Sequence, residues 1–161
     1  MRLEKRLVVD SFTSQRVRNA PFVLKAGENV LTFDRETLKK FGLSPSRKLV
    51  GKDLIVILKS RKIKYNHSTI AVKPLTDLKD NDVLIRRVEK KETHSKEYSL
   101  MFPEINKVEY RAFFSTGFFG NYGSEFPCPF YDLDFEINEK EYQELKKLPK
   151  NTVMNVGFSL E

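Results

Sequence analysis

Two segments near opposite ends of this 161-residue chain share one pattern of strand, polar break, short helix, turn and strand. They are residues 29–58 and 131–160. Over residues 131–137 apolar and acidic side chains alternate, which is typical of a half-buried strand. Two similar modules in one chain predict a β-rich fold with internal pseudo-symmetry, and such folds more often bind or assemble than catalyse. The alternative is that a common arrangement arose twice without duplication.

Each module contains residues that predict a short helix. In the first, Asp34 is an N-cap candidate for a helix over residues 35–41. In the second, Asn138 is followed three residues later by Glu141, the spacing of a capping box. We expect that second helix to end before Pro149, because proline removes a backbone donor and clashes with the preceding turn.

The rest of the chain reads mainly as short strands joined by polar segments. Strands are expected at residues 5–10, 21–25, 29–33, 53–58, 69–72, 83–88, 98–102, 108–114, 131–137 and 154–160. The polar segments 11–20 and 89–96 are expected to be connections between strands. The fold class is therefore α+β and mainly β: one domain over residues 1–161, a barrel or sandwich with two short helices. It could comprise two packed halves, 1–75 and 76–161.

The first module resembles a known family. Its residues Gly27–Asp34, Leu38–Leu43 and Gly51–Val56 are similar to the swapped-hairpin module of AbrB-type transcription factors, and the resemblance covers residues 27–58. Members of that family are dimeric DNA-binding proteins, and related double-length chains form closed barrels. The resemblance therefore implies a barrel-like fold and nucleic acid as a partner. Glu28 stands where the family usually carries a basic residue, so the DNA contact is less directly implied than the fold.

Charge is distributed unevenly along the chain. Residues 1–100 hold 23 lysines and arginines against 12 acids, whereas residues 101–161 hold 6 against 10, which together give the net charge of +7. The first part is a candidate surface for a polyanion, with head-to-tail self-association as the competing interpretation. The single cysteine, Cys128, cannot form an internal disulfide. Together with the lack of a membrane-length apolar run or a secretory signal, this predicts a cytoplasmic protein. The low glutamine content hints at a thermophilic source.

The densest basic segment is the strongest functional candidate. Between residues 47 and 73 eight lysines and arginines accompany one acid, Asp53. Side chains that meet phosphates release counterions, and an aromatic residue among them can stack on an unpaired base. The expected nucleic-acid-binding residues, for DNA or RNA, are Arg47, Lys48, Lys59, Arg61, Lys62, Lys64 and Tyr65. The alternative is that these lysines sit on an edge strand and prevent aggregation.

A second basic group lies in the predicted strand around residue 86. Arg86 and Arg87 are consecutive, so in a regular strand they face opposite sides and only one of them can extend the basic surface. Pairing with the nearby acids Glu89 and Glu92 is the favoured interpretation for this group.

Residues 115–129 form an aromatic, glycine-rich segment. Glycines allow tight folding of the backbone while the rings remain available for contact. The segment could bind a protein partner or a second copy through Phe118, Phe119 and Tyr122. The alternative is a purely structural loop that packs on itself and covers one end of the fold.

No motif in the chain identifies an enzyme. His67 and His94 lack metal-ligand spacing, and no glycine-rich phosphate loop precedes a helix. Asp82 with Glu89–Lys91 fits a permissive pattern of metal-dependent nucleases, and Asp132, Asp134 and Glu136 share a strand face that could hold a cation. We therefore expect a non-catalytic binding protein with no cofactor and no metal, and a structural or adaptor protein is the alternative.

Overall fold

A computed structural model describes residues 1–14, 22–33, 49–62, 81–94, 106–115, 131–149 and 152–161. In these ranges the chain forms nine strands and one helix: β1 (Arg2–Val8), β2 (Ser11–Ser14), β3 (Phe22–Ala26), β4 (Asn29–Phe33), β5 (Asp53–Lys62), β6 (Asp82–His94), β7 (Asn106–Ser115), β8 (Tyr131–Ile137), α3 (Glu139–Lys146) and β9 (Thr152–Leu160). The prediction of a mainly β chain is confirmed. The helix expected over residues 35–41 lies outside the described ranges.

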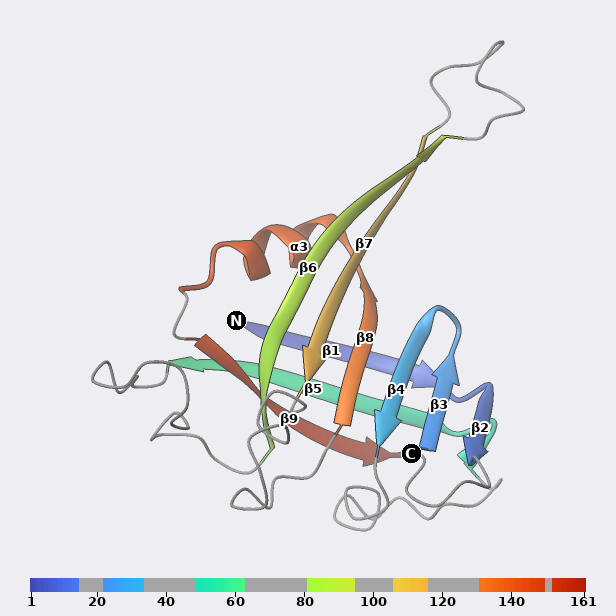
Figure 1. Ribbon diagram of the computed structural model, residues 1–161. Coiled ribbons are helices and arrows are strands. Elements are labelled where there is room, and N and C mark those ends of the chain that lie inside the picture. The colour runs from blue at the N-terminus through green and yellow to red at the C-terminus, as the bar shows by residue number, and fades with distance from the viewer. Residues whose placement is uncertain (15–21, 34–48, 63–80, 95–105, 116–130, 150–151) are drawn as a thin grey trace.

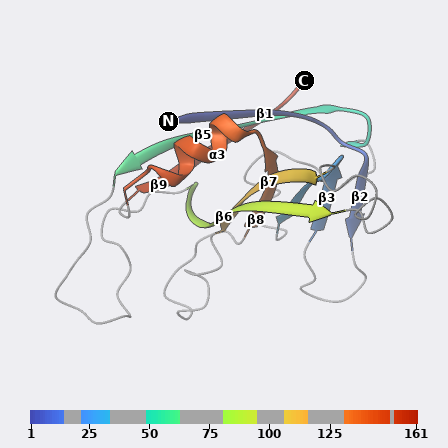
Figure 2. The ribbon, with the colours of Figure 1, turned by 90° about the horizontal axis from the view of Figure 1, so that it is seen from above.

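All nine strands belong to one antiparallel sheet in the order β1-β5-β9-β6-β7-β8-β4-β3-β2. The described strands end at two open edges, β1 and β2, so they do not show the closed barrel or the sandwich that the sequence suggested. Figures 1 and 2 show that the sheet is strongly bent. The strands β1, β5 and β9 form one layer, and they cross the strands from β6 to β2, which form the other.

The chain passes between the two layers at two places. One is β6, whose first residues Asp82 and Val83 pair with β9 while the rest of the strand pairs with β7. The other follows β1: the Val9 N–H donates to the Lys52 carbonyl in the first layer, and the Asp10 N–H donates to the Lys25 carbonyl in the second, at 3.0 and 2.8 Å. Both connections keep the backbone hydrogen-bonded while it turns, as a buried backbone requires.

The core fills the space between the layers. It contains the inward-facing residues of the strands, among them Leu3, Leu24, Leu31, Phe33, Leu54, Val56, Leu58, Phe114, Leu133, Phe135, Met154 and Val156. The period-two pattern explains this arrangement, since every second residue of a strand faces the same side. In β8, for example, Leu133 and Phe135 are buried and their neighbours Asp132 and Asp134 lie on the outer face.

Helix α3 closes one side of the gap between the layers. The predicted capping box is present: the Asn138 side chain accepts from the Glu141 N–H at 2.7 Å, and the Glu141 side chain accepts from the Asn138 N–H at 3.0 Å. Tyr142 and Leu145 point into the core, where the Tyr142 ring lies 4.9 Å from that of Tyr110. Because Lys5 also forms an ion pair with Glu141 at 2.9 Å, the helix is tied to β1 as well.

The two similar segments of the sequence pair with each other, strand to equivalent strand. Strand β4 pairs with β8, and β5 pairs with β9. Leu31 faces Leu133, and Val56 faces Phe158. In each pair the two residues hold equivalent positions in the segments that start at residues 29 and 131. Each of the two pairings therefore has local two-fold symmetry, which is the arrangement expected of an internal repeat.

Several expected boundaries were wrong. Residues 89–94 continue β6 as a regular strand paired with β7, although their polar sequence suggested a connection. Figure 1 shows that β6 and β7 extend beyond the other strands as a two-stranded ribbon. Solvent reaches both faces of such a ribbon, so a polar sequence is compatible with it. The first strand begins at Arg2 rather than residue 5, and residues 11–14 form β2.

Candidate functional site

The end of β5 carries the described part of the basic segment. The strand runs to Lys62; it pairs with β9 up to that residue but with β1 only as far as Lys59. Lys59 and Lys62 are exposed, and Lys59 lies directly opposite exposed Arg2 of β1. No ion pair joins these three cations to an acid in the described part of the chain. Arg2 and Lys59 lie on the outer face of the sheet, whereas Lys62, three residues further along the regular strand, points to the opposite side. We call these three cations at one end of the two strands the β1/β5 basic end.

Arg61 does not belong to this group. Its guanidinium forms a two-pronged ion pair with Asp82, in which Nε lies 3.2 and 3.1 Å from the two carboxylate oxygens and Nη2 bonds Oδ2. The Asp82 side chain is 0% exposed, and Asn155 donates to it at 2.9 Å. A guanidinium held in this way is not available to a phosphate. Arg61 is thus engaged in joining β5, β6 and β9, and we do not include it among the contacts proposed below.

The other predicted contacts, Arg47, Lys48, Lys64 and Tyr65, lie outside the described residues. So do the partner-binding candidates Phe118, Phe119 and Tyr122, together with Cys128 and His67. Conversely, the sequence reasoning missed Arg2, because only the pairing register of β1 with β5 brings it opposite Lys59.

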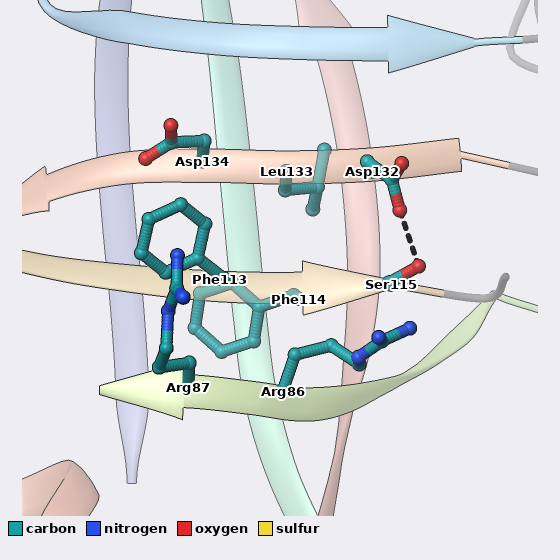
Figure 3. A pocket seen from close by; sticks show the side chains of 8 residues that line it. All are labelled: Arg86, Arg87, Phe113, Phe114, Ser115, Asp132, Leu133 and Asp134. Carbon is teal, nitrogen blue, oxygen red and sulfur yellow. Dashed lines mark hydrogen bonds between the residues drawn. The ribbon is translucent and has the colours of Figure 1, made fainter. Parts of the chain in front are cut away.

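A β-bulge changes the expected geometry of Arg86 and Arg87. Ile85 pairs with Phe114 and Arg87 pairs with Phe113, so Arg86 is an extra residue in β6. A bulge redirects side chains that would otherwise alternate. Both arginines therefore line one pocket on the outer face of the sheet, and the prediction that only one of them reaches a given surface was wrong (Figure 3).

This pocket is open, with a volume of about 370 Å³, and is lined by Arg86, Arg87, Phe113, Phe114, Ser115, Asp132, Leu133 and Asp134. Figure 3 shows arginines from β6 on one side and carboxylates from β8 on the other, with β7 between them. The Arg87 guanidinium lies 4.3 Å above the Phe113 ring, and Ser115 donates to Asp132. Asp134 pairs with Arg111 at 2.8 Å. Because two arginines and two aspartates line the pocket, it has no excess charge for a polyanion.

The β6–β7 ribbon neutralises its charges in the same local way. Arg87 pairs with Glu89 at 2.6 Å, Lys90 with Glu92 at 3.4 Å and Lys107 with Glu109 at 2.8 Å. The expected pairing with Glu89 and Glu92 is thus confirmed for Arg87 and Lys90. The hydrogen bond and the charge of Lys107 lower the pKa of Glu109, and Glu109 in turn raises the pKa of Lys107.

The residues considered for metal-dependent chemistry do not assemble. Asp82 is buried against Arg61, whereas Glu89 is bound to Arg87 on the ribbon. Among the described residues no group of three or more histidine, cysteine or acidic side chains could hold a metal ion. Asp132, Asp134 and Glu136 do share the outer face of β8, but Asp132 and Asp134 are engaged by Ser115 and Arg111.

Comparisons with known proteins assign no family and no function to this chain. No family model, curated protein or solved structure matches this chain. No helix in the described ranges has both the length and the apolar character needed to cross a membrane.

Proposed function

We propose that this chain is a non-catalytic nucleic-acid-binding protein that contacts phosphates through the β1/β5 basic end. The observation that carries the proposal is the pairing register, which sets Arg2 opposite Lys59, with Lys62 three residues further along β5. The next residues of the chain include Lys64 and Tyr65, which continue the basic segment and supply an aromatic ring. Tyr65 is proposed to stack on a base.

Contacts of this kind determine affinity rather than sequence preference. Lysine and arginine meet phosphate oxygens, which are the same at every position of a nucleic acid, and binding releases condensed counterions. We therefore propose sequence-tolerant binding of DNA or RNA with a strong dependence on salt. A cytoplasmic location is part of the proposal.

The finer fold is also a proposal. The local two-fold symmetry of the β4–β8 and β5–β9 pairings supports a duplicated swapped-hairpin fold of the AbrB type, with halves 1–75 and 76–161 in one domain. Under this proposal the two halves complete one barrel.

The decisive experiment is a binding titration with labelled single- and double-stranded oligonucleotides over a series of salt concentrations. The variant Lys59→Glu/Lys62→Glu reverses two exposed charges without touching Arg61. It is expected to weaken binding at every salt concentration and to reduce the slope of log affinity against log salt by about two. The matched control is Lys140→Glu/Lys147→Glu, which makes the same charge change at exposed positions in and after α3.

Equal losses in the two variants would mean that only net charge matters, and unchanged binding by Lys59→Glu/Lys62→Glu would reject the site. Arg61 is left unchanged because its reversal would place two carboxylates against each other in the interior.

An adaptor protein is the second candidate function. The supporting observation is that β7 ends at Ser115 and β8 begins at Tyr131, so the aromatic segment joins two strands that line the open pocket. If this segment binds a protein partner, Phe118→Ser/Phe119→Ser abolishes assembly and leaves oligonucleotide binding intact. Normal assembly of that variant would count against the adaptor.

A further inference from the structure

The outer edge of β1 has backbone groups that point away from the sheet. The Ser60 N–H donates to the Met1 carbonyl at 2.9 Å, and the Val9 N–H donates to the Lys52 carbonyl at 3.0 Å. Odd-numbered residues of β1 therefore direct their backbone groups toward β5. Arg2, the residues at positions 4 and 6, and Val8 direct theirs outward, because successive residues of an antiparallel strand alternate. No described strand pairs with that side.

The side chains along this edge have a regular order. Leu3 and Leu7 face the core and are buried, and Lys5 between them is paired with Glu141. On the opposite face the four even-numbered residues are exposed, in the order arginine, glutamate, arginine, valine. Val8 is 55% exposed, which is high for a large apolar side chain in a strand.

We infer that β1 pairs with β1 of a second copy of this chain, antiparallel and centred on Lys5, to form a two-fold symmetric dimer. This register uses all seven residues of the strand. It places Glu4 opposite Arg6 of the second copy and Arg6 opposite Glu4, so opposite charges meet twice. The outward groups of the even-numbered residues then form about eight new backbone hydrogen bonds. The layer β9-β5-β1 continues into the second copy as six strands.

Other registers lack this complementarity. Centring on Glu4 places Glu4 opposite itself and Arg2 opposite Arg6, and centring on Arg6 places Arg6 opposite itself. Like charges directly opposite one another destabilise a strand pair. A shift that sets even-numbered residues opposite odd-numbered ones turns side chains to the wrong face and leaves backbone groups unpaired. The pair of Lys5 residues at the axis is tolerated because each is bound to its own Glu141.

Charged residues on an edge strand commonly serve to prevent association. A row of like charges repels a second copy in every register. Here the signs alternate and are self-complementary about the middle of the strand. The other open edge, β2, has only four residues and offers much less to pair with.

The test is a charge exchange followed by sedimentation analysis over a concentration series, without nucleic acid. The wild type is expected to dimerise, and Glu4→Arg is expected to weaken dimerisation by at least about tenfold because arginine then faces Arg6 twice. The double variant Glu4→Arg/Arg6→Glu restores opposite charges and is expected to recover the dimer. Arg6 also lies 3.6 Å from Glu161, but both side chains are more than half exposed, so that pair is weak.

A wild type that is monomeric at every concentration would overturn the inference, as would a dimer that Glu4→Arg leaves unchanged. Because the assay contains no oligonucleotide, failure of the dimer and failure of nucleic-acid binding are separate results. Circular dichroism of each variant shows whether the fold is kept. Glu4→Pro gives an independent check, because the Glu4 N–H points outward, so proline blocks the dimer without removing a hydrogen bond to β5.

Cross-linking tests the register itself. In a Cys128→Ser background, Lys5→Cys brings two thiols together at the two-fold axis, where opposite Cβ atoms lie about 4.5–5.5 Å apart, close to disulfide distance. We expect a covalent dimer under mild oxidation. Val8→Cys in the same background is the matched control, because Val8 lies opposite Arg2 and far from its own equivalent. Cross-linking of Val8→Cys but not of Lys5→Cys would refute this register.

Discussion

Arg61→Met should destabilise the fold strongly, because it leaves the Asp82 carboxylate buried without its guanidinium. The Asp82 side chain is 0% exposed and that of Arg61 is 22% exposed, so solvent cannot replace the lost partner. Removing one member of a buried ion pair costs about 3–5 kcal/mol in free energy of unfolding. Methionine preserves most of the apolar stem, so the loss reports the charge rather than the packing.

The double variant Arg61→Met/Asp82→Asn separates charge from hydrogen bonding. Neither charge remains, and asparagine keeps the shape of the side chain beside Asn155, which donates to Asp82 at 2.9 Å. We expect this variant to be more stable than Arg61→Met, with a coupling energy between the two positions of about 1–3 kcal/mol. Stability is measured by urea unfolding followed by far-ultraviolet circular dichroism and tyrosine fluorescence.

The matched control is Arg87→Met. Arg87 also pairs with a carboxylate, that of Glu89, but their side chains are 60% and 37% exposed. Exposed pairs contribute about 0–1 kcal/mol. If Arg61→Met costs no more than Arg87→Met, or if the double variant is no more stable than Arg61→Met alone, burial does not set the energy of this ion pair.

Two further predictions concern the helix cap and the ribbon. Asn138→Ala removes the cap of α3 and should lower the free energy of unfolding by about 1 kcal/mol in the same urea assay, whereas an unchanged midpoint would deny the cap a role. A side-chain NMR titration should place the pKa of Glu109 below its ordinary value, and Lys107→Met should return it toward that value. Because the folded-state pKa is lowered, any stability from this pair is present above the unfolded-state pKa and is lost as the pH falls through the folded-state pKa. Identical titration curves with and without Lys107 would contradict this explanation.

The parts of the fold that follow from local pattern were predictable. The alternation over residues 131–137 identified β8, and the spacing of Asn138 and Glu141 identified the start of α3. Between β3 and β4 the φ of Gly27 is 59°, which explains the glycine there. Each of these signals lies within a few residues and reflects one dominant interaction, either burial of one strand face or capping of one helix end.

The candidate sites depended on features that a local pattern does not contain. The sequence around Arg86 does not predict a bulge, because the extra residue is an arginine and its position is set by the pairing with β7. In the sequence Asp82 resembles any acid in a polar turn. It lies 21 residues from Arg61, and only the pairing of the strands brings the two side chains together. The charge of the basic segment alone therefore groups Arg61 with Lys59 and Lys62, although in the fold Arg61 forms an ion pair with the buried Asp82.

The strand order also joins the two similar segments into one sheet. Strand β5 lies between β1 of its own half and β9 of the other, and β4 likewise lies between β3 and β8. Neither half can satisfy its backbone groups alone, because both seams are pairs between halves. The layer containing β5 and β9 is then continued by β6 on one side, while β1 leaves it open on the other. A pseudo-two-fold axis inside the chain and a true two-fold axis at Lys5 would thus extend the same layer by the same antiparallel pairing. This is why the outer edge of β1, rather than the short edge of β2, is where a second copy should dock.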